Sequence, residues 1–415
     1  MSEQAKIIRR RILMVIPELG FGGAEKSFLH LAQLLSEFHD VSLVVFKRHY
    51  AKGNYSKKEE DISLPLIVLD SGVDSGRLGR WHNRLSKLRA LKNDADLTIS
   101  FLTGANILNV VSGGQGSKVV SMRGSRRYDP AFSRLRLLLY EHFVDPLTFK
   151  YSDSIIAISE GLSGELRRNV GVATQTKIKT IQLFIDAKQL INSSNDIIEE
   201  QISELIAYPV IVAAGRLSPE KGFQNLLHVF AIVRKSVPGA KFLLIGDGPL
   251  YKYLKELCEI LNLPVSDGKS NVLESAVIFL GYCNNPNRYF RVARLFVMSS
   301  IAEGFSNVLL EALAAGIPVI AVNCPWGPRS ILWKEPDDVI TPYPTVTPTY
   351  ADYGVLMPRI DQARFHHIWA DELVKLLNQP SLVEKYAERG PQRVREFDSQ
   401  LIVHKWLDVI EELCR

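Results

Sequence analysis

Two glutamates flank a short loop in the second half of the chain. Glu303 is followed by a Gly-Phe-Ser sequence, and Glu311 lies eight residues after Glu303. If a helix opens at residues 304–306, its unpaired backbone N–H groups form an anion site beside Glu303. Carboxylates on both sides would suit the hydroxyls of a sugar and a ribose at the two ends of a diphosphate. A capped helix with one solvated and one salt-bridged glutamate fits the spacing equally well.

The surrounding pattern predicts the elements that position these glutamates. Leu295–Met298 and Val319–Val322 are short apolar runs, and apolar residues at helical spacing lie between them: Val308, Leu309, Ala312, Leu313 and Ala315. Gly316 and Pro318 end the helix. The segment is a βαβ unit, so Glu303 follows the carboxyl end of a parallel strand, where open α/β sheets bind ligands.

A second strand-to-helix turn adds positive charge at the same end of the sheet. The apolar run 210–214 leads into Gly215 and Arg216, and Lys221 and Gly222 follow. Two cations and a helix N-terminus suit a diphosphate, because arginine can bind two of its oxygens at once. Taken alone, Arg216 and Lys221 would be ordinary surface charges. Their expected position at the same end of the sheet as Glu303 supports a role in binding.

Strand-like runs alternate with helical patterns along most of the chain. They are residues 11–17, 41–46, 64–69, 97–101, 119–122 and 154–158, and then 209–214, 241–245, 276–280, 295–298 and 319–322. The alternation predicts two α/β halves with mostly parallel, doubly wound sheets. The polar stretch 186–204 is interpreted as the linker. The glycine-rich turn at 20–23 lacks a third glycine at dinucleotide spacing, which disfavours nicotinamide binding.

Composition is that of a globular chain with a basic first half. The 415 residues are 46% hydrophobic and 23% charged, enough for two or three domains. We expect no signal peptide or membrane span, and reduced cysteines in the cytoplasm. Residues 1–195 hold 28 lysines and arginines against 19 acids, whereas the remainder has an acidic excess. This asymmetry favours a polyanionic partner, or else a solvated basic face.

Several motifs together resemble the retaining glycosyltransferases of family 4, also called group 1. The motifs are Gly215-Arg-Leu-Ser-Pro-Glu-Lys-Gly222, Gly246-Asp-Gly-Pro249, Glu303-Gly-Phe-Ser-Asn-Val-Leu-Leu-Glu-Ala312, Gly22-Gly-Ala-Glu25 and Ser159-Glu-Gly161. The resemblance covers nearly the whole chain. It implies a GT-B fold with two Rossmann-like domains facing across a cleft. An N-terminal acceptor domain would span residues 1–190 and include a crossover helix at 397–415, and a nucleotide-sugar domain would span residues 205–396.

The resemblance also implies a role for each matching residue. Arg216 and Lys221 would neutralise the donor diphosphate, and Glu303 would contact the donor sugar. The remaining donor-binding residues would be Gly22, Gly23, Tyr282, Cys283, Gly304, Phe305, Ser306, Asn307 and Glu311. Of these, Glu311 would bind the ribose, and Tyr282 and Cys283 would lie near the base.

Two positions depart from the family pattern. Arg123 lies after a strand where many relatives have histidine, and we expect it to act with Glu303, Arg216 and Lys221 in catalysis. Ser330 stands where relatives commonly have glutamate, which bears on donor selectivity. Asp94-Ala-Asp96 superficially matches a metal motif, but it precedes a strand and is interpreted as structural.

The function expected from the resemblance is retaining transfer of a sugar from a nucleotide donor, with a UDP-sugar favoured. The acceptor would be a glycan or lipid-linked molecule of bacterial surface polysaccharide or lipopolysaccharide assembly. We expect no cofactor and no metal requirement, because fixed cations and helix dipoles can stabilise the leaving diphosphate. One alternative is a GT-B phosphorylase, which absorbance of a pyridoxal group would reveal. The other is a basic nucleic-acid-binding module, which no motif supports and a gel shift would test.

Two basic amphipathic segments raise the question of a membrane surface. In one, Arg126, Arg127, Arg134 and Arg136 flank Phe132, Leu135, Leu138, Leu139, Tyr140 and Phe143. In the other, Arg77, Arg80, Arg84, Lys87 and Arg89 alternate with Trp81, Leu85, Leu88 and Leu91. Such helices can lie on anionic lipid at the inner face of the cell membrane. They can equally pack their apolar side on the domain's own sheet.

Overall fold

The chain divides into two compact units in the computed structural model, which describes residues 8–20, 23–47, 63–71, 76–125, 127, 133–193, 196–324, 326–334 and 345–415. The first unit comprises residues up to Gly124 together with Ser133–Phe184 and Gln400–Arg415. The second consists mainly of Ile185–Ser399. The predicted linker 186–204 therefore lies in the second unit, where it contains two short helices.

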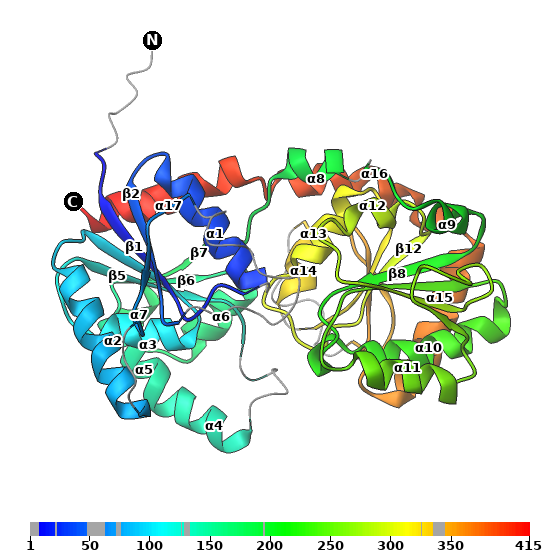
Figure 1. Ribbon diagram of the computed structural model, residues 1–415, viewed down its shortest axis with the longest axis horizontal. Helices are drawn as coiled ribbons and strands as arrows, with labels where there is room; N and C mark the ends of the chain where they lie inside the picture. Colours follow the sequence, from blue (N-terminus) through cyan, green and yellow to red (C-terminus); the bar gives the residue numbers. More distant parts are fainter. Residues whose placement is uncertain are drawn as a thin grey trace, which may run out of the picture. The chain divides into compact units, whose positions relative to one another are not determined.

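A parallel sheet forms the centre of the first unit (Figure 1). Over the described residues it has seven strands in the order β3-β2-β1-β4-β5-β6-β7. Their bounds are β1 Arg11–Ile16, β2 Asp40–Val45, β3 Leu66–Val68, β4 Leu97–Phe101, β5 Ser117–Met122, β6 Ser154–Ala157 and β7 Ile178–Thr180. The chain winds outward from β1 in both directions, which is the doubly wound arrangement predicted from the sequence.

Helices cover both faces of this sheet, which explains why β1 is apolar at nearly every position. Ile12, Met14 and Ile16 pack under α1 and α17, whereas Leu13 and Val15 pack toward α2 and α3. The helices of this unit are α1 Gly23–Ser36, α2 Arg77–Lys92, α3 Thr103–Val111, α4 Arg134–Leu139, α5 Asp145–Tyr151, α6 Glu160–Arg168, α7 Val172–Gln175 and α17 Ser399–Leu413. A π-helical turn, η3 Tyr140–Val144, joins α4 to α5.

The second unit repeats the architecture with eight strands in the described part of the chain. Their order is β10-β11-β9-β8-β12-β13-β15-β14, and only the β14–β15 pair in this described sheet is antiparallel. The bounds are β8 Val210–Ala214, β9 Lys241–Ile245, β10 Val265–Ser266, β11 Val277–Gly281, β12 Leu295–Met298, β13 Val319–Val322, β14 Thr349–Tyr350 and β15 Val355–Met357. The eleven strand-like runs predicted from the sequence in the two halves all form strands.

The helices of the second unit also form two layers (Figure 1). One layer holds α10 Phe223–Ser236, α11 Tyr251–Ile260 and α15 His366–Asn378. The other holds α8 Ala187–Ser193, α12 Asn287–Phe290, α13 Asn307–Ala314 and α16 Ser381–Arg395. Shorter elements are α9 Glu200–Ser203, α14 Gly327–Leu332 and the 3₁₀ turns η4 Glu204–Ala207, η5 Pro219–Lys221 and η6 Ala363–Phe365. No helix in the described part of the chain is long and apolar enough to span a bilayer.

Candidate active site

The topological switch point of the second sheet lies between β8 and β12. These strands are neighbours, although three strands separate them in the sequence, because the chain reverses its direction of winding there. Helices on opposite faces of the sheet follow the two strands, so the loops at their carboxyl ends diverge and leave ligand-binding space. The loop after β8 carries Arg216 and Lys221, and the loop after β12 carries Glu303.

Gly222 brings the first of these loops against the end of β12. It has φ +69°, and a Cβ atom there would lie 2.4 Å from the carbonyl oxygen of Ser299. Glycine is therefore required both for the backbone conformation and for the close approach. Two hydrogen bonds hold the contact, because Ser299 Oγ donates to the Lys221 carbonyl at 2.8 Å and Ile301 N–H donates to the Glu220 carbonyl at 2.8 Å.

The contact places Lys221 and Glu303 in an ion pair. Lys221 Nζ donates to Glu303 Oε1, and the two side chains are only 24% and 12% exposed. Burial alone would lower the pKa of Lys221, but the nearby carboxylate of Glu303 outweighs it and raises the pKa above its usual value. The lysine is therefore firmly cationic at neutral pH.

The start of α14 also fixes the backbone of Glu303. Residue 303 forms a parallel bridge with Trp326, and Gly327 N–H donates to the Glu303 carbonyl at 3.2 Å. Cys324 lies beside the ion pair, where burial and then the charge of Glu303 raise the pKa of its thiol far above the usual value. The thiol is therefore neutral and leaves the electrostatics of the pair to Lys221 and Glu303.

Helix α13 begins at Asn307, three residues later than the sequence predicts. Residues 303–305 stay outside the helix because Glu303 pairs with Trp326, and Ser306 becomes the N-cap. The Ser306 side chain makes no capping hydrogen bond. The Asn307 side-chain oxygen is buried and has no hydrogen-bond partner within the described residues. The Asn307 oxygen next to the helix N-terminus therefore remains available to a ligand.

The other predicted residues of the second unit lie on the same carboxyl edge. Arg216 is exposed at the beginning of the β8 loop, and Gly304 and Phe305 follow Glu303, with Phe305 buried against Phe397 at a ring-centroid distance of 5.5 Å. Glu311 lies half-buried in the second turn of α13.

The loop after β11 carries Tyr282 and Cys283. Cys283 Sγ donates to the Asn285 carbonyl at 3.2 Å, and Asn285 Nδ2 in turn donates to Asp196 Oδ2 at 2.6 Å. Burial, followed by the effect of Cys283, raises the pKa of the Tyr282 phenol. The loop therefore carries uncharged side chains near its tip, and hydrogen bonds through Asn285 hold its base. This arrangement suits contact with an uncharged group.

In the first unit, Arg123 follows β5 and stacks on Phe101, with its guanidinium carbon 4.7 Å from the ring centroid. Burial lowers the pKa of Arg123 to about 10, although Glu25 opposes this shift. The Arg123 Nη2 atom is buried without a hydrogen-bond partner among the described residues. Gly23 is the first residue of α1, and Gly22 lies outside the described residues, as do Arg126 and Phe132.

Comparison with known proteins finds similar sequences and similar folds. Residues 208–348 match the family model described as glycosyl transferases group 1. An uncharacterized glycosyltransferase of Methanocaldococcus jannaschii is 28% identical over 299 residues, which cover 68% of this chain and 67% of the relative. Anabaena HepE, solved in complex with UDP and glucose, aligns with a TM-score of 0.73 at 19% identity and covers 98% of this chain and 100% of its own.

The chain resembles the group 1 glycosyl transferases through residues 208–348 of its second unit. Its two doubly wound parallel sheets have the GT-B fold of its structural neighbours, as predicted. A named relative is the N-acetylgalactosamine-N,N'-diacetylbacillosaminyl-diphospho-undecaprenol 4-alpha-N-acetylgalactosaminyltransferase of Campylobacter jejuni, 28% identical over 197 residues. That alignment spans 48% of this chain and about half, 48%, of the relative's length.

Three contacts around the candidate residues were not predicted from the sequence. Glu25 is the charged neighbour of Arg123, and Cys324 is the neighbour of the ion pair. The third is an interlock of glycines, since a Cβ on Gly246 would lie 1.8 Å from the Gly215 carbonyl oxygen. The Gly-Asp-Gly-Pro motif gave a signal for the last of these, because clustered glycines indicate close backbone approach.

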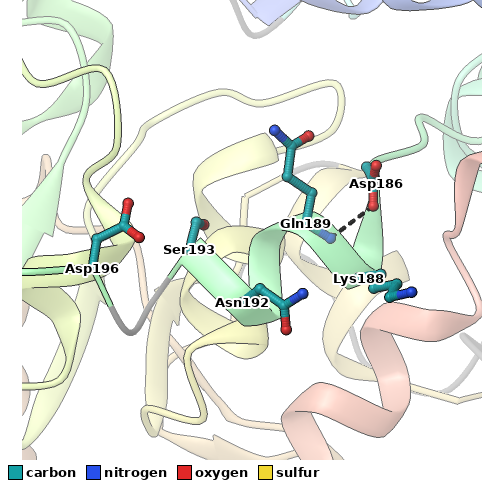
Figure 2. A pocket seen from close by; sticks show the side chains of 6 residues that line it. All are labelled: Asp186, Lys188, Gln189, Asn192, Ser193 and Asp196. Atoms are coloured by element: carbon teal, nitrogen blue, oxygen red, sulfur yellow. Dashed lines mark hydrogen bonds between the residues drawn. The ribbon is translucent and has the colours of Figure 1, made fainter.

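A cavity of about 440 Å³ lies along α8 in the second unit. Its lining residues, shown in Figure 2, are Asp186, Lys188, Gln189, Asn192, Ser193 and Asp196. Asp186 Oδ1 accepts the backbone N–H of Gln189 at 2.7 Å, which fixes one end of the lining. None of the predicted site residues lines this cavity, although Asp196 anchors the loop of Cys283 through Asn285.

Proposed function

We propose that this chain is a retaining glycosyltransferase that moves a sugar from a UDP-sugar to a glycan or lipid-linked acceptor. The observation that carries the proposal is the Lys221–Glu303 pair at the switch point, next to the start of α13. The pair sets a fixed cation and a carboxylate side by side at the carboxyl edge of the sheet. A sugar diphosphate offers the matching groups, since its phosphates are anionic and its sugar hydroxyls are hydrogen-bond donors.

In this proposal cationic side chains and backbone N–H groups bind the diphosphate. Lys221 and the exposed Arg216 neutralise the phosphates, and the unpaired amides of α13 add the positive end of the helix dipole. The Asn307 side-chain oxygen has no hydrogen-bond partner among the described residues, and the Ser306 hydroxyl makes no capping hydrogen bond. Both groups therefore offer the ligand further polar contacts. Glu311, one turn further along the helix, accepts hydrogen bonds from the ribose hydroxyls.

Glu303 holds the sugar, while Tyr282 and Cys283 lie against the base. In the transfer step, the acceptor oxygen bonds to the anomeric carbon as the bond from that carbon to the phosphate oxygen breaks. The departing diphosphate carries the electron pair and takes the proton of the acceptor hydroxyl, so attack and departure occur on one face and the configuration is retained. Lys221 and Arg216 stabilise the charge that develops on the leaving group. The roles expected of Arg123, Gly22 and Gly23 in the first unit stay predictions.

The name of one relative supports the acceptor class, and the availability of nucleotide sugars supports the compartment. The Campylobacter jejuni relative is named for a diphospho-undecaprenol acceptor, which supports a glycan or lipid-linked acceptor in bacterial surface polysaccharide or lipopolysaccharide assembly. We place the enzyme in the cytoplasm, where nucleotide sugars are available to it.

A thermal-shift panel of UDP-, GDP-, ADP- and dTDP-sugars tests the donor. Ligand that binds only the native state stabilises it by about 2.7 kcal/mol at one hundred times its Kd, so a UDP-sugar should raise Tm clearly. Lys221→Met should abolish the shift, whereas the control Lys235→Met, at an exposed position of α10, should keep it. A panel in which no nucleotide sugar shifts Tm would overturn the proposal.

The stabilising donor is then incubated with candidate acceptors, and the anomeric configuration of the product is read by NMR. Retention is expected. A product of inverted configuration would contradict the proposed transfer chemistry while leaving the donor site intact.

A further inference from the structure

The two basic amphipathic segments of the first unit have different surroundings. In α2, Leu88 is fully buried, and Trp81, Leu85 and Leu91 pack against the same core cluster. Two α2 cations are also engaged, since Arg84 forms an ion pair with Asp70 at 2.6 Å and Lys87 Nζ donates to the Leu69 carbonyl at 2.9 Å. This helix therefore uses its apolar side for its own domain.

The segment α4–η3–α5 leaves its apolar side in solvent. Leu135, Leu139, Phe143, Leu147 and Tyr151 are between 42% and 79% exposed, and Leu138 is 51% exposed. No residue of α4 or η3 is buried, whereas α5 is attached to the unit through Thr148 and Phe149. Figure 1 shows α4 continuing into α5 at the lower edge of the first unit.

The exposed side chains form one continuous stripe. Five of them recur at every fourth residue, from Leu135 to Tyr151. In a regular α-helix this spacing drifts around the axis, because each turn takes 3.6 residues. The wider π-helical turn at Tyr140–Val144 offsets part of that drift. Single exposed apolar residues are ordinary, but an aligned row of this size on one helix face marks an interaction surface.

The charges around the stripe are cationic on the outward side. Arg134, Arg136 and Lys150 are all exposed, and His142 is exposed as well. The acidic residues of the segment, Glu141 and Asp145, are half-buried. A partner approaching the stripe therefore meets apolar side chains bordered by positive charge.

We propose that the outward face of α4–α5 docks on the anionic surface of a lipid bilayer. A helix lying in the interface inserts its apolar side chains below the headgroups, and its cations pair with anionic lipid phosphates. The stripe supplies the first requirement, and the exposed Arg134 and Lys150 supply the second. This surface is built from different residues than the donor site, so the inference stands or fails independently of the transfer reaction.

A second copy of the chain fits the stripe less well. In a two-fold dimer the same patch meets itself, so the cations bordering one stripe would be brought close to the same cations of the partner. The resulting repulsion favours an anionic occupant over an identical one.

Vesicle co-sedimentation of the full chain tests the proposal. Vesicles of phosphatidylcholine are compared with vesicles that also contain phosphatidylglycerol, at about 0.05 M and about 0.5 M NaCl, where electrostatic screening differs strongly. We expect binding to the anionic vesicles that weakens at high salt, and little binding to neutral ones. Equal recovery from both vesicle types, or from neither, overturns the proposal.

Two variants separate the apolar from the ionic contribution. L135Q/L139Q/F143Q removes apolar contact without adding charge and should weaken binding about 100-fold or more. R134Q/K150Q should weaken it about 25-fold, because each cation near the surface contributes about fivefold. Their matched controls are I197Q/I206Q/I260Q, at residues 67–86% exposed in the second unit, and R389Q/R395Q on α16.

The control variants should bind vesicles as the wild type does, and all variants should keep the wild-type Tm. Controls that lose binding as strongly as the α4–α5 variants would show that any exposed residue matters and would overturn the assignment. A dimer that dissociates in L135Q/L139Q/F143Q, together with vesicle binding that persists, would assign the stripe to a second copy and also overturn it.

Discussion

Lys221 and Glu303 are poorly exposed charges that satisfy each other within the second unit. Removing one partner of such a pair leaves the other charge uncompensated, which is usually more harmful than the pair is stabilising. In the proposed mechanism both side chains also bind the donor. Lys221 binds a phosphate and Glu303 binds the sugar. Substitutions of single residues should therefore have separate effects on donor binding and on sugar transfer.

Glu303→Gln should mainly slow transfer, and Glu311→Gln should mainly weaken donor binding. For Glu303 we expect a fall in kcat of about 100-fold, the range seen when one stabilising contact of a transition state is removed. For Glu311 we expect donor Kd to rise about tenfold, as for the loss of a hydrogen bond to a charged group. Steady-state kinetics and calorimetric titration with the donor measure both. Unchanged kinetics in both variants would refute the site assignment.

Lys92 predicts a pH dependence of stability in the first unit. It is fully buried, and its Nζ donates to the Asn109 carbonyl at 2.8 Å. Burial, with a smaller contribution from Lys118, lowers the pKa of Lys92 from 10.5 to about 7. Between these values the unfolded chain holds a proton that the folded chain has released, so stability should rise with pH. The gain from pH 7 to pH 9 should be about 2 kcal/mol.

Urea unfolding of the wild type and of Lys92→Met at pH 7, 8 and 9 measures this contribution. The difference between the two proteins isolates Lys92 from other groups that titrate in the same range. Parallel pH profiles would show that the lysine keeps its proton in the fold.

At the scale of the elements, the loop after β8 is shaped by backbone packing. The φ of +69° at Gly222 and the approach to Ser299 fix where Lys221 points. The sequence predicted this turn from its glycines and cations, and it predicted the strands on either side. It did not predict that α13 begins only at Asn307, because the bridge between Glu303 and Trp326 that delays the helix is a tertiary contact.

Gly222→Ala should destabilise the second unit by about 2 kcal/mol or more, because the backbone conformation and the contact with Ser299 are both unfavourable for alanine. Gly239→Ala is the matched control, since a Cβ atom there meets nothing within 4 Å. Chemical denaturation should show a loss for the first variant and at most a small change for the second. Equal stability of the two variants would contradict the packing argument.

At the scale of the whole molecule, the last helix completes a core that begins at the first strand. Trp406 of α17 is 2% exposed and stacks on Phe101, with ring centroids 6.3 Å apart. Ile402, Val403, Val409 and Ile410 join the same cluster as the β1 residues. The first unit therefore depends on a segment about 400 residues away in sequence from β1.

Trp406→Ala should destabilise the first unit by about 3–5 kcal/mol, the usual cost of removing a buried aromatic side chain. Because the chain has two units, unfolding need not be two-state, so hydrogen exchange is the better measurement. Amides of β1 and β4 should lose protection, while those of β8 and β12 keep theirs. Loss of protection in both sheets to the same extent would show that the units unfold together.

The sequence by itself determined the strands, the doubly wound character of both sheets, and the loops that carry the candidate residues. Local periodicity and glycine placement suffice for these, because strand burial and turn conformation depend mainly on nearby residues. Short strands such as β7, β10, β14 and β15 were not predicted, since two or three residues give no periodicity.

Only the tertiary structure decided which charges meet and which apolar faces are covered. Pairing Lys221 with Glu303 joins residues from two loops, and the long-range contacts that align them leave no trace in local spacing. The two basic helices have similar patterns in the sequence, yet α2 packs on the sheet and α4 does not. The physical reason is that burial is settled by what the rest of the chain places opposite a helix, and a helix's own residues do not encode that.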